Sequence, residues 1–76
     1  MAQLDTAAET IRVRINGDER EVPAGLAVPG LLEHLGLHPR TVVVERNGDI
    51  LRRDALDGVP VEPGDAFELV HFVGGG

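Results

Sequence analysis

The chain closes with Val73, Gly74, Gly75 and Gly76, and these residues offer the clearest chemistry in the sequence. Glycine has no Cβ, so a glycine tail can pass through a narrow channel and adopt backbone angles that other residues rarely adopt. Four extended residues span about 13–14 Å, which is enough to carry the Gly76 carboxylate into the active site of a partner enzyme. We therefore expect residues 73–76 to form a flexible tail, with Gly76 as the reacting group and Val73, Gly74 and Gly75 as the threaded stalk. The alternative is an ordinary frayed terminus.

No other group of residues in the sequence favours catalysis or metal binding. Cysteine is absent, which excludes thiolate nucleophiles, disulfides and cysteine-ligated metals. His34 and His38 have a spacing that can hold a metal on a helix, but Gly36 and Pro39 interrupt a helix there and no third ligand is in view. The terminal glycines precede no helix, so they cannot form a phosphate-binding loop. We expect no catalytic residue, no metal and no bound cofactor in this chain.

Composition narrows the class of partner. Thirteen acidic residues against seven arginines give a net charge of −6. An acidic surface repels phosphate backbones, which argues against nucleic acid as a partner, and it favours a basic protein surface. The first ten residues carry no apolar run that could act as a signal peptide or membrane anchor. We therefore expect a cytoplasmic protein with no membrane partner that is a monomer when free.

The elements that must position the tail begin with a β-hairpin, after a polar leader at residues 1–9. In residues 11–15 apolar side chains alternate with arginines, which is the period of a half-buried strand. Asn16 and Gly17 favour the type I′ turn of a two-residue hairpin. The return strand is predicted at residues 20–22.

One short helix follows the hairpin. Val28, Leu31, Leu32 and Leu35 lie at i, i+3, i+4 and i+7 and form a single apolar stripe. Gly36 stands where a glycine typically ends a helix. Gly30 within the predicted segment weakens the isolated helix by about 1 kcal/mol relative to alanine, so packing against the rest of the protein must hold this helix.

Further strands are predicted at residues 42–46 and 50–51, on either side of a second Asn-Gly turn, and at residues 66–72. Residues 52–61 are expected to be an irregular connection or a single helical turn. One amphipathic helix can bury its stripe only against one face of a sheet. We predict an α+β, ubiquitin-like β-grasp domain at residues 10–72, with a mixed four- to five-stranded sheet, one helix on one face, and the first and last strands adjacent and parallel.

The last strand divides its side chains between two faces. Alternation places Phe67 and Leu69 in the core and Glu68, Val70 and Phe72 on the face away from the helix. An exposed apolar pair beside the tail is typical of a docking site, so Val70 and Phe72 are the predicted docking residues. Glu68 would help to steer a basic partner. The alternative for Phe72 is a side chain folded over the sheet edge.

Over about residues 11–76 the chain resembles the ThiS family, the sulfur carrier proteins of thiamine biosynthesis. Residues 31–37 are similar to the family's Leu-Leu-x-x-Leu-Gly helix, and residues 42–48 to its central strand and turn. Residues 70–76 are similar to its closing sequence almost residue for residue. The leader is additional, and Arg52 stands where many relatives carry proline.

The resemblance implies a protein co-substrate, not an enzyme. An adenylating enzyme of the ubiquitin-activating type would use ATP and Mg²⁺ to adenylate the Gly76 carboxylate. Sulfur would then replace AMP to give a thiocarboxylate, and a thiazole synthase would take that sulfur into the thiazole ring. Two alternatives stay open. One is a sulfur carrier for another pathway, such as the small subunit of molybdopterin synthase or a carrier for cysteine or tRNA thiolation; the other is a ubiquitin-like interaction module that uses only its sheet face.

Overall fold

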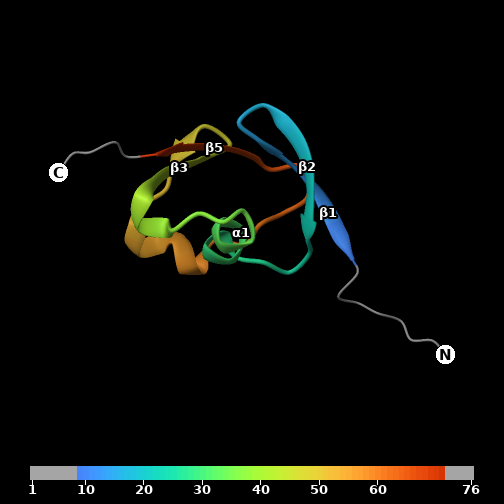
Figure 1. Cartoon of the computed structure of the whole chain (residues 1–76), viewed down its shortest axis with the longest axis horizontal. Coiled ribbons are helices and arrows are strands. Elements are labelled where there is room, and N and C mark those ends of the chain that lie inside the picture. Colours follow the sequence, from blue (N-terminus) through green and yellow to red (C-terminus); the bar gives the residue numbers. More distant parts are fainter. Residues whose placement is uncertain (1–8, 72–76) are drawn as a thin grey trace.

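In the computed structural model, which describes residues 9–71, five strands form one mixed sheet in the order β2-β1-β5-β3-β4, and a single α-helix covers one of its faces (Figure 1). The elements in chain order are β1 (Thr10–Ile15), β2 (Asp18–Pro23), α1 (Val28–His34), the 3-10 helix η2 (Pro39–Thr41), β3 (Val42–Arg46), β4 (Asp49–Ile50), the 3-10 helix η3 (Arg53–Gly58) and β5 (Ala66–His71). No helix in this part of the chain is long and apolar enough to cross a membrane.

Both Asn-Gly pairs form the turns that the sequence predicts. Asn16 and Gly17 have φ values of 51° and 90°, and they join β1 to β2 in an antiparallel hairpin. Asn47 and Gly48 have φ values of 52° and 92°, and they join β3 to β4. Positive φ at both central residues is the requirement of a type I′ turn, and asparagine followed by glycine meets it at the least steric cost.

The centre of the sheet is β5, the last strand of the chain. It runs parallel to β1, with Ile15 opposite Phe67, and antiparallel to β3, with Val44 opposite Leu69. The first and last strands are therefore adjacent and parallel, and the predicted β-grasp arrangement is confirmed. Strand β5 is paired with β1 only as far as Phe67, whereas its pairing with β3 continues to His71.

The core lies between the sheet and α1. Leu31 and Leu32 are fully buried and Phe67 is 1% exposed. Helix α1 has only seven residues and no side-chain N-cap, so its stability comes from packing its leucines against the sheet. A Cβ at Gly30 would lie 3.2 Å from Cδ2 of Leu26, so that this side chain would have to shift by a few tenths of an ångström.

The connection from β4 to β5 is a single 3-10 segment, as the sequence analysis allowed. In η3 the side chain of Leu56 is buried in the core. Backbone bonds then tie the following residues to the start of α1, with the Val28 N–H donating to the Val59 carbonyl at 2.9 Å and the Val61 N–H donating to the Leu26 carbonyl at 2.9 Å. These contacts fix the helix layer relative to the sheet.

Candidate functional site

The candidate site is the end of β5, from which the chain runs into its glycine tail. His71 is the last described residue, so Phe72 and the predicted tail, Val73, Gly74, Gly75 and Gly76, lie outside the described residues. The structure instead describes the residues around the end of β5, where the tail begins.

An apolar patch covers the sheet face opposite α1 at this end of the molecule. Val70 is 60% exposed on β5, and Val43 lies directly opposite it on β3. Ile50 on β4 is 72% exposed and, together with Val43, borders one shallow hollow at the edge of β3. We name Val43, Ile50 and Val70 the outer apolar patch. Isolated exposed apolar side chains are common, but a group beside a functional terminus marks an interaction surface.

Strand alternation in the sequence predicts Val70 in this patch but not Val43 or Ile50. Val43 stands between two valines that are buried in the core, so the run of three valines carries no alternation in its letters. Only the strand period shows that the middle valine must face outward. Ile50 belongs to a strand of two residues, which is too short for a periodic signal.

Two carboxylates lie side by side next to the outer apolar patch. Glu68 is exposed on the predicted face, and its direct cross-strand partner on β3 is Glu45. Like charges in this position repel each other. Within residues 9–71 neither carboxylate forms an ion pair. The arrangement is unfavourable in the free protein and suits a partner that brings a cation to this spot.

The end of β5 is fixed by the side chain of Asn16. Its Oδ1 accepts a hydrogen bond from the Leu69 N–H at 2.8 Å, and its Nδ2 donates to the Leu69 carbonyl at 3.3 Å. The pairing of β1 with β5 stops at Ile15 and Phe67, so this amide continues the ladder by one step beyond the end of β1. Asn16, which the sequence predicts only as a turn residue, therefore also holds the end of β5 in position.

The start of β5 is fixed by a second set of polar side chains, centred on Asp65. This carboxylate is 5% exposed. It accepts hydrogen bonds from Arg46 Nε at 3.0 Å, from Asn47 Nδ2 at 3.2 Å and from the Glu62 N–H at 2.9 Å. Asn47 also accepts a bond from the Ala66 N–H through its Oδ1, at 2.9 Å. The β3–β4 turn therefore holds the first residues of β5 in register.

Two opposing effects act on the pKa of Asp65. Burial alone would raise it, whereas the hydrogen bonds from Glu62, Arg46 and Asn47, together with the charge of Arg46, lower it. The net effect is a pKa below the ordinary value of an aspartate. The ionised carboxylate is the form that stabilises this end of β5.

Comparison with known proteins decides what kind of protein this is. The model of the ThiS family matches residues 13–76. The chain belongs to the ThiS family.

Two relatives and a solved structure agree with this membership. The chain is 39% identical over 49 residues to the sulfur carrier protein ThiS of Bacillus subtilis, a match that covers 64% of this chain and 74% of the relative. It is 42% identical over 66 residues to a thiazole synthase of Paramagnetospirillum magneticum, covering 87% of this chain but only about a fifth of the synthase's length. The crystal structure of a ThiS thiamine biosynthesis protein from Geobacter metallireducens superposes with a TM-score of 0.75 at 38% identity, covering 87% of this chain and all of that one.

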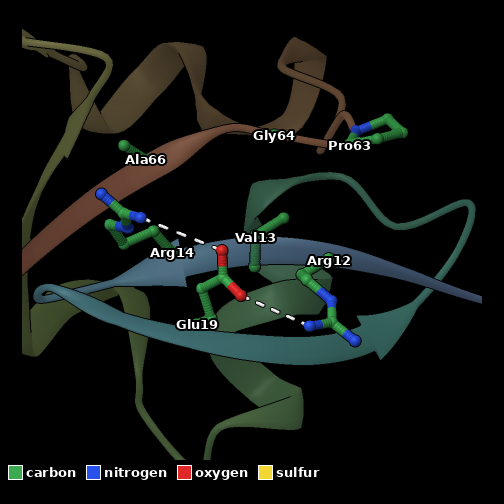
Figure 2. Close-up of a pocket in the computed structure, with 7 residues that line it drawn as sticks. All are labelled: Arg12, Val13, Arg14, Glu19, Pro63, Gly64 and Ala66. Carbon is green, nitrogen blue, oxygen red and sulfur yellow. Dashed lines mark hydrogen bonds and ion pairs between the residues drawn. The ribbon is translucent and has the colours of Figure 1, made fainter.

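A further cluster of charged side chains, on the outer face of the β1–β2 hairpin of this ThiS-family chain, is paired within itself. A hollow of about 410 Å³ lies at the start of β5. Glu19 stands between Arg12 and Arg14 on its wall (Figure 2), and its carboxylate oxygens lie 3.3 Å from Arg12 Nη1 and 3.9 Å from Arg14 Nη2. Arg12 also pairs with Glu21 at 3.3 Å. Both guanidinium groups are thus balanced by carboxylates of the same face, and the hollow lies at the end of β5 remote from His71.

The histidine pair considered in the sequence has a local structural role. His38 caps η2, because its Nδ1 accepts a hydrogen bond from the Arg40 N–H at 3.1 Å. His34 is the last residue of α1 and is exposed. In the part of the chain that the structure describes, no three His, Cys, Asp or Glu side chains lie together as a metal site would need.

Proposed function

We propose that this ThiS-family chain is a sulfur carrier of thiamine biosynthesis and that the carboxylate of Gly76 is the group that carries the sulfur. The observation that supports this most strongly is the family match, which extends through all three glycines to residue 76. The fold supports it as well, because β5 is the central strand of the sheet and leads directly toward those glycines.

The proposed chemistry follows from the weak electrophilicity of a carboxylate. A Gly76 oxygen attacks the α-phosphate of ATP and pyrophosphate leaves, which gives an acyl-adenylate. Sulfide, as HS−, then attacks the acyl carbon and AMP leaves with the original carboxylate oxygen, and loss of the remaining proton gives the thiocarboxylate. The tail and ATP are both negatively charged, so the partner enzyme must supply Mg²⁺ and cationic side chains. In this scheme the chain itself is a co-substrate and holds no cofactor.

We propose that the adenylating enzyme docks on the outer apolar patch and on the two carboxylates beside it. Val70 is one residue from the end of β5, so a partner seated on it lies next to the origin of the tail. Glu45 and Glu68 would receive a cation from this partner, which relieves their mutual repulsion and favours correct encounter. In this proposal the docked fold and the length of the tail restrict the Gly76 carboxylate to one region of the partner's active site.

We propose that a thiazole synthase is the acceptor of the sulfur. The support is the Paramagnetospirillum magneticum thiazole synthase, which contains a region 42% identical to this chain. A carrier that meets two soluble enzymes in turn and depends on ATP is expected to act in the cytoplasm, as a monomer between encounters.

The direct test of the carrier role is to shorten the tail. A chain that ends at Gly74 lacks the reacting carboxylate at its proper distance but keeps every residue of the sheet. With the adenylating enzyme from the same organism, the full chain should support ATP–pyrophosphate exchange and the shortened chain should not. Equal thermal melts of the two chains would establish that folding is unaffected. An interaction module that uses only its sheet face predicts equal behaviour of both chains, and that result would refute the carrier role.

A further inference from the structure

A second hollow lies at the end of β5, on the side of the sheet that faces α1. Its volume is about 240 Å³. The residues that matter in its lining are Leu35, Leu37, Leu69, Arg20, Asn16 and His71. It is thus separated from the outer apolar patch by the thickness of the sheet, and both surfaces flank the origin of the tail.

The floor of this hollow is apolar and firmly held. Leu35, Leu37 and Leu69 pack against the core but each remains only half-buried. Gly36, with φ of 79°, turns the chain after α1, and the Leu37 N–H donates to the Leu32 carbonyl at 2.8 Å. The leucines are therefore presented by an ordered loop, in a position where one apolar side chain of a partner could cover them.

The rim carries an arginine that has no ion pair within the described part of the chain. Arg20 is exposed and forms no ion pair with any residue in the range 9–71. This is notable because four of the other arginines pair with acids of the same chain, which are Arg12, Arg14, Arg46 and Arg52. A free guanidinium beside an apolar floor is a preferred position for a partner's carboxylate, since charge-assisted hydrogen bonds to arginine are strong and directional.

The backbone of β5 is also open on this side. Asn16 satisfies both the N–H and the carbonyl of Leu69, and these groups point away from β3. Backbone groups two residues apart in a strand point the same way, so those of His71 do too. No described residue pairs with His71 on that side, because β1 ends at Ile15. An extended segment could add to β5 here through main-chain hydrogen bonds.

We propose that this hollow binds an extended segment of the thiazole synthase, with an apolar side chain on the leucine floor and an adjacent carboxylate paired with Arg20. The inference rests on the proposed function. The two faces differ in charge within residues 9–71: the outer face, proposed above for the adenylating enzyme, has two carboxylates without an ion pair, whereas the hollow has an arginine without one. Because opposite charges suit different partners, we assign the hollow to the second enzyme. The two enzymes that must take the tail in turn would then approach its origin from opposite faces of the sheet.

The test is charge reversal at Arg20 with a matched control at Arg40. Arg40 is also exposed and without an ion pair in the described chain, but it does not line the hollow. Titration calorimetry of the full chain with thiazole synthase should show affinity about tenfold weaker for Arg20→Glu and about unchanged for Arg40→Glu. Arg20→Gln, which removes the charge without reversing it, should give an intermediate loss. ATP–pyrophosphate exchange with the adenylating enzyme should be the same for wild type and all three variants.

Each contrary outcome refutes either the proposed binding site or the proposed function. Equal affinity of Arg20→Glu and wild type for the synthase refutes the role of the hollow. Equal losses of affinity in Arg20→Glu and Arg40→Glu also refute it, because they would show that the synthase responds to the net charge of the carrier and not to a group in the hollow. A loss of exchange in Arg20→Glu with synthase binding intact would show that the hollow serves the adenylating enzyme, which refutes the assignment. Absence of exchange in the wild-type chain would instead refute the proposed function itself.

Discussion

The side chain of Asn16 is predicted to hold the end of β5 in place, and its removal can be tested without disturbing the hairpin. Asn16→Gly keeps a residue that accepts the positive φ of 51° and deletes the two hydrogen bonds to Leu69. Each bond is worth about 0.5–1.5 kcal/mol net. Because this site is exposed, we take the lower part of the summed range and expect a loss of about 1–2 kcal/mol in the free energy of unfolding.

Urea denaturation measures that loss, and hydrogen exchange locates it. The Leu69 N–H donates to Asn16 Oδ1 at 2.8 Å, so its amide should lose protection in Asn16→Gly while the amides of the β1–β2 hairpin keep theirs. Asn16→Asp is the matched control, because its carboxylate still accepts from Leu69 but cannot donate to the Leu69 carbonyl. Unchanged protection of the Leu69 amide in Asn16→Gly, or a loss below about 0.3 kcal/mol, would show that the amide does not position β5.

Three further predictions concern the acid response, the core and the docking face. Asp65→Asn should lower the free energy of unfolding at neutral pH, and it should lower it less in acid. The reason is that hydrogen bonds hold the pKa of Asp65 below its ordinary value. The difference in stability between wild type and Asp65→Asn should therefore be complete above about pH 4 and disappear as the pH falls through the lowered pKa. Urea titrations across this range would refute the argument if the difference between the two chains did not change with pH. Leu31→Ala should lower the free energy of unfolding by about 2–5 kcal/mol, because Leu31 is fully buried; a loss below about 1 kcal/mol in urea denaturation would mean that the helix packs less tightly than described. Val70→Asp should leave the free energy of unfolding within about 0.5 kcal/mol of wild type yet weaken binding to the adenylating enzyme by about tenfold or more. The control Ala24→Asp, at an exposed position in the loop between β2 and α1, should leave both the stability and the affinity unchanged. Equal affinities of Val70→Asp and wild type, measured by calorimetry, would contradict the docking face.

Local patterns were sufficient to predict the five strands and the α-helix in their order, but not the 3-10 helix η2. Each Asn-Gly pair sets a turn by its own backbone preference, and the apolar stripe from Val28 to Leu32 sets the helix that buries it. Alternation in the last strand correctly separated Phe67, which is buried, from Val70, which is exposed. These features depend on residues close together in the sequence, so no knowledge of the register between strands is needed.

The details that position the site depend on contacts between distant residues and were missed. Asn16 bonds to Leu69 across 53 positions, and nothing in an Asn-Gly pair indicates that its side chain will reach another strand. Asp65 follows Pro63 and Gly64 and has the sequence context of an ordinary turn residue. In the structure, however, it is nearly fully buried, and its carboxylate accepts three hydrogen bonds. The outer apolar patch likewise becomes visible only when β3 and β5 are placed in register. The tail itself lies outside the described residues, and its role stays a proposal.

The central claim is that Gly76 becomes a thiocarboxylate, and intact-protein mass spectrometry tests it most directly. The full chain would be incubated with ATP, Mg²⁺, a sulfide source and the adenylating enzyme of the same organism. The account predicts a mass increase equal to the replacement of one oxygen by sulfur, confined to the C-terminal peptide and absent when ATP is omitted. An unchanged mass, with the same enzyme active on another carrier, would contradict the account.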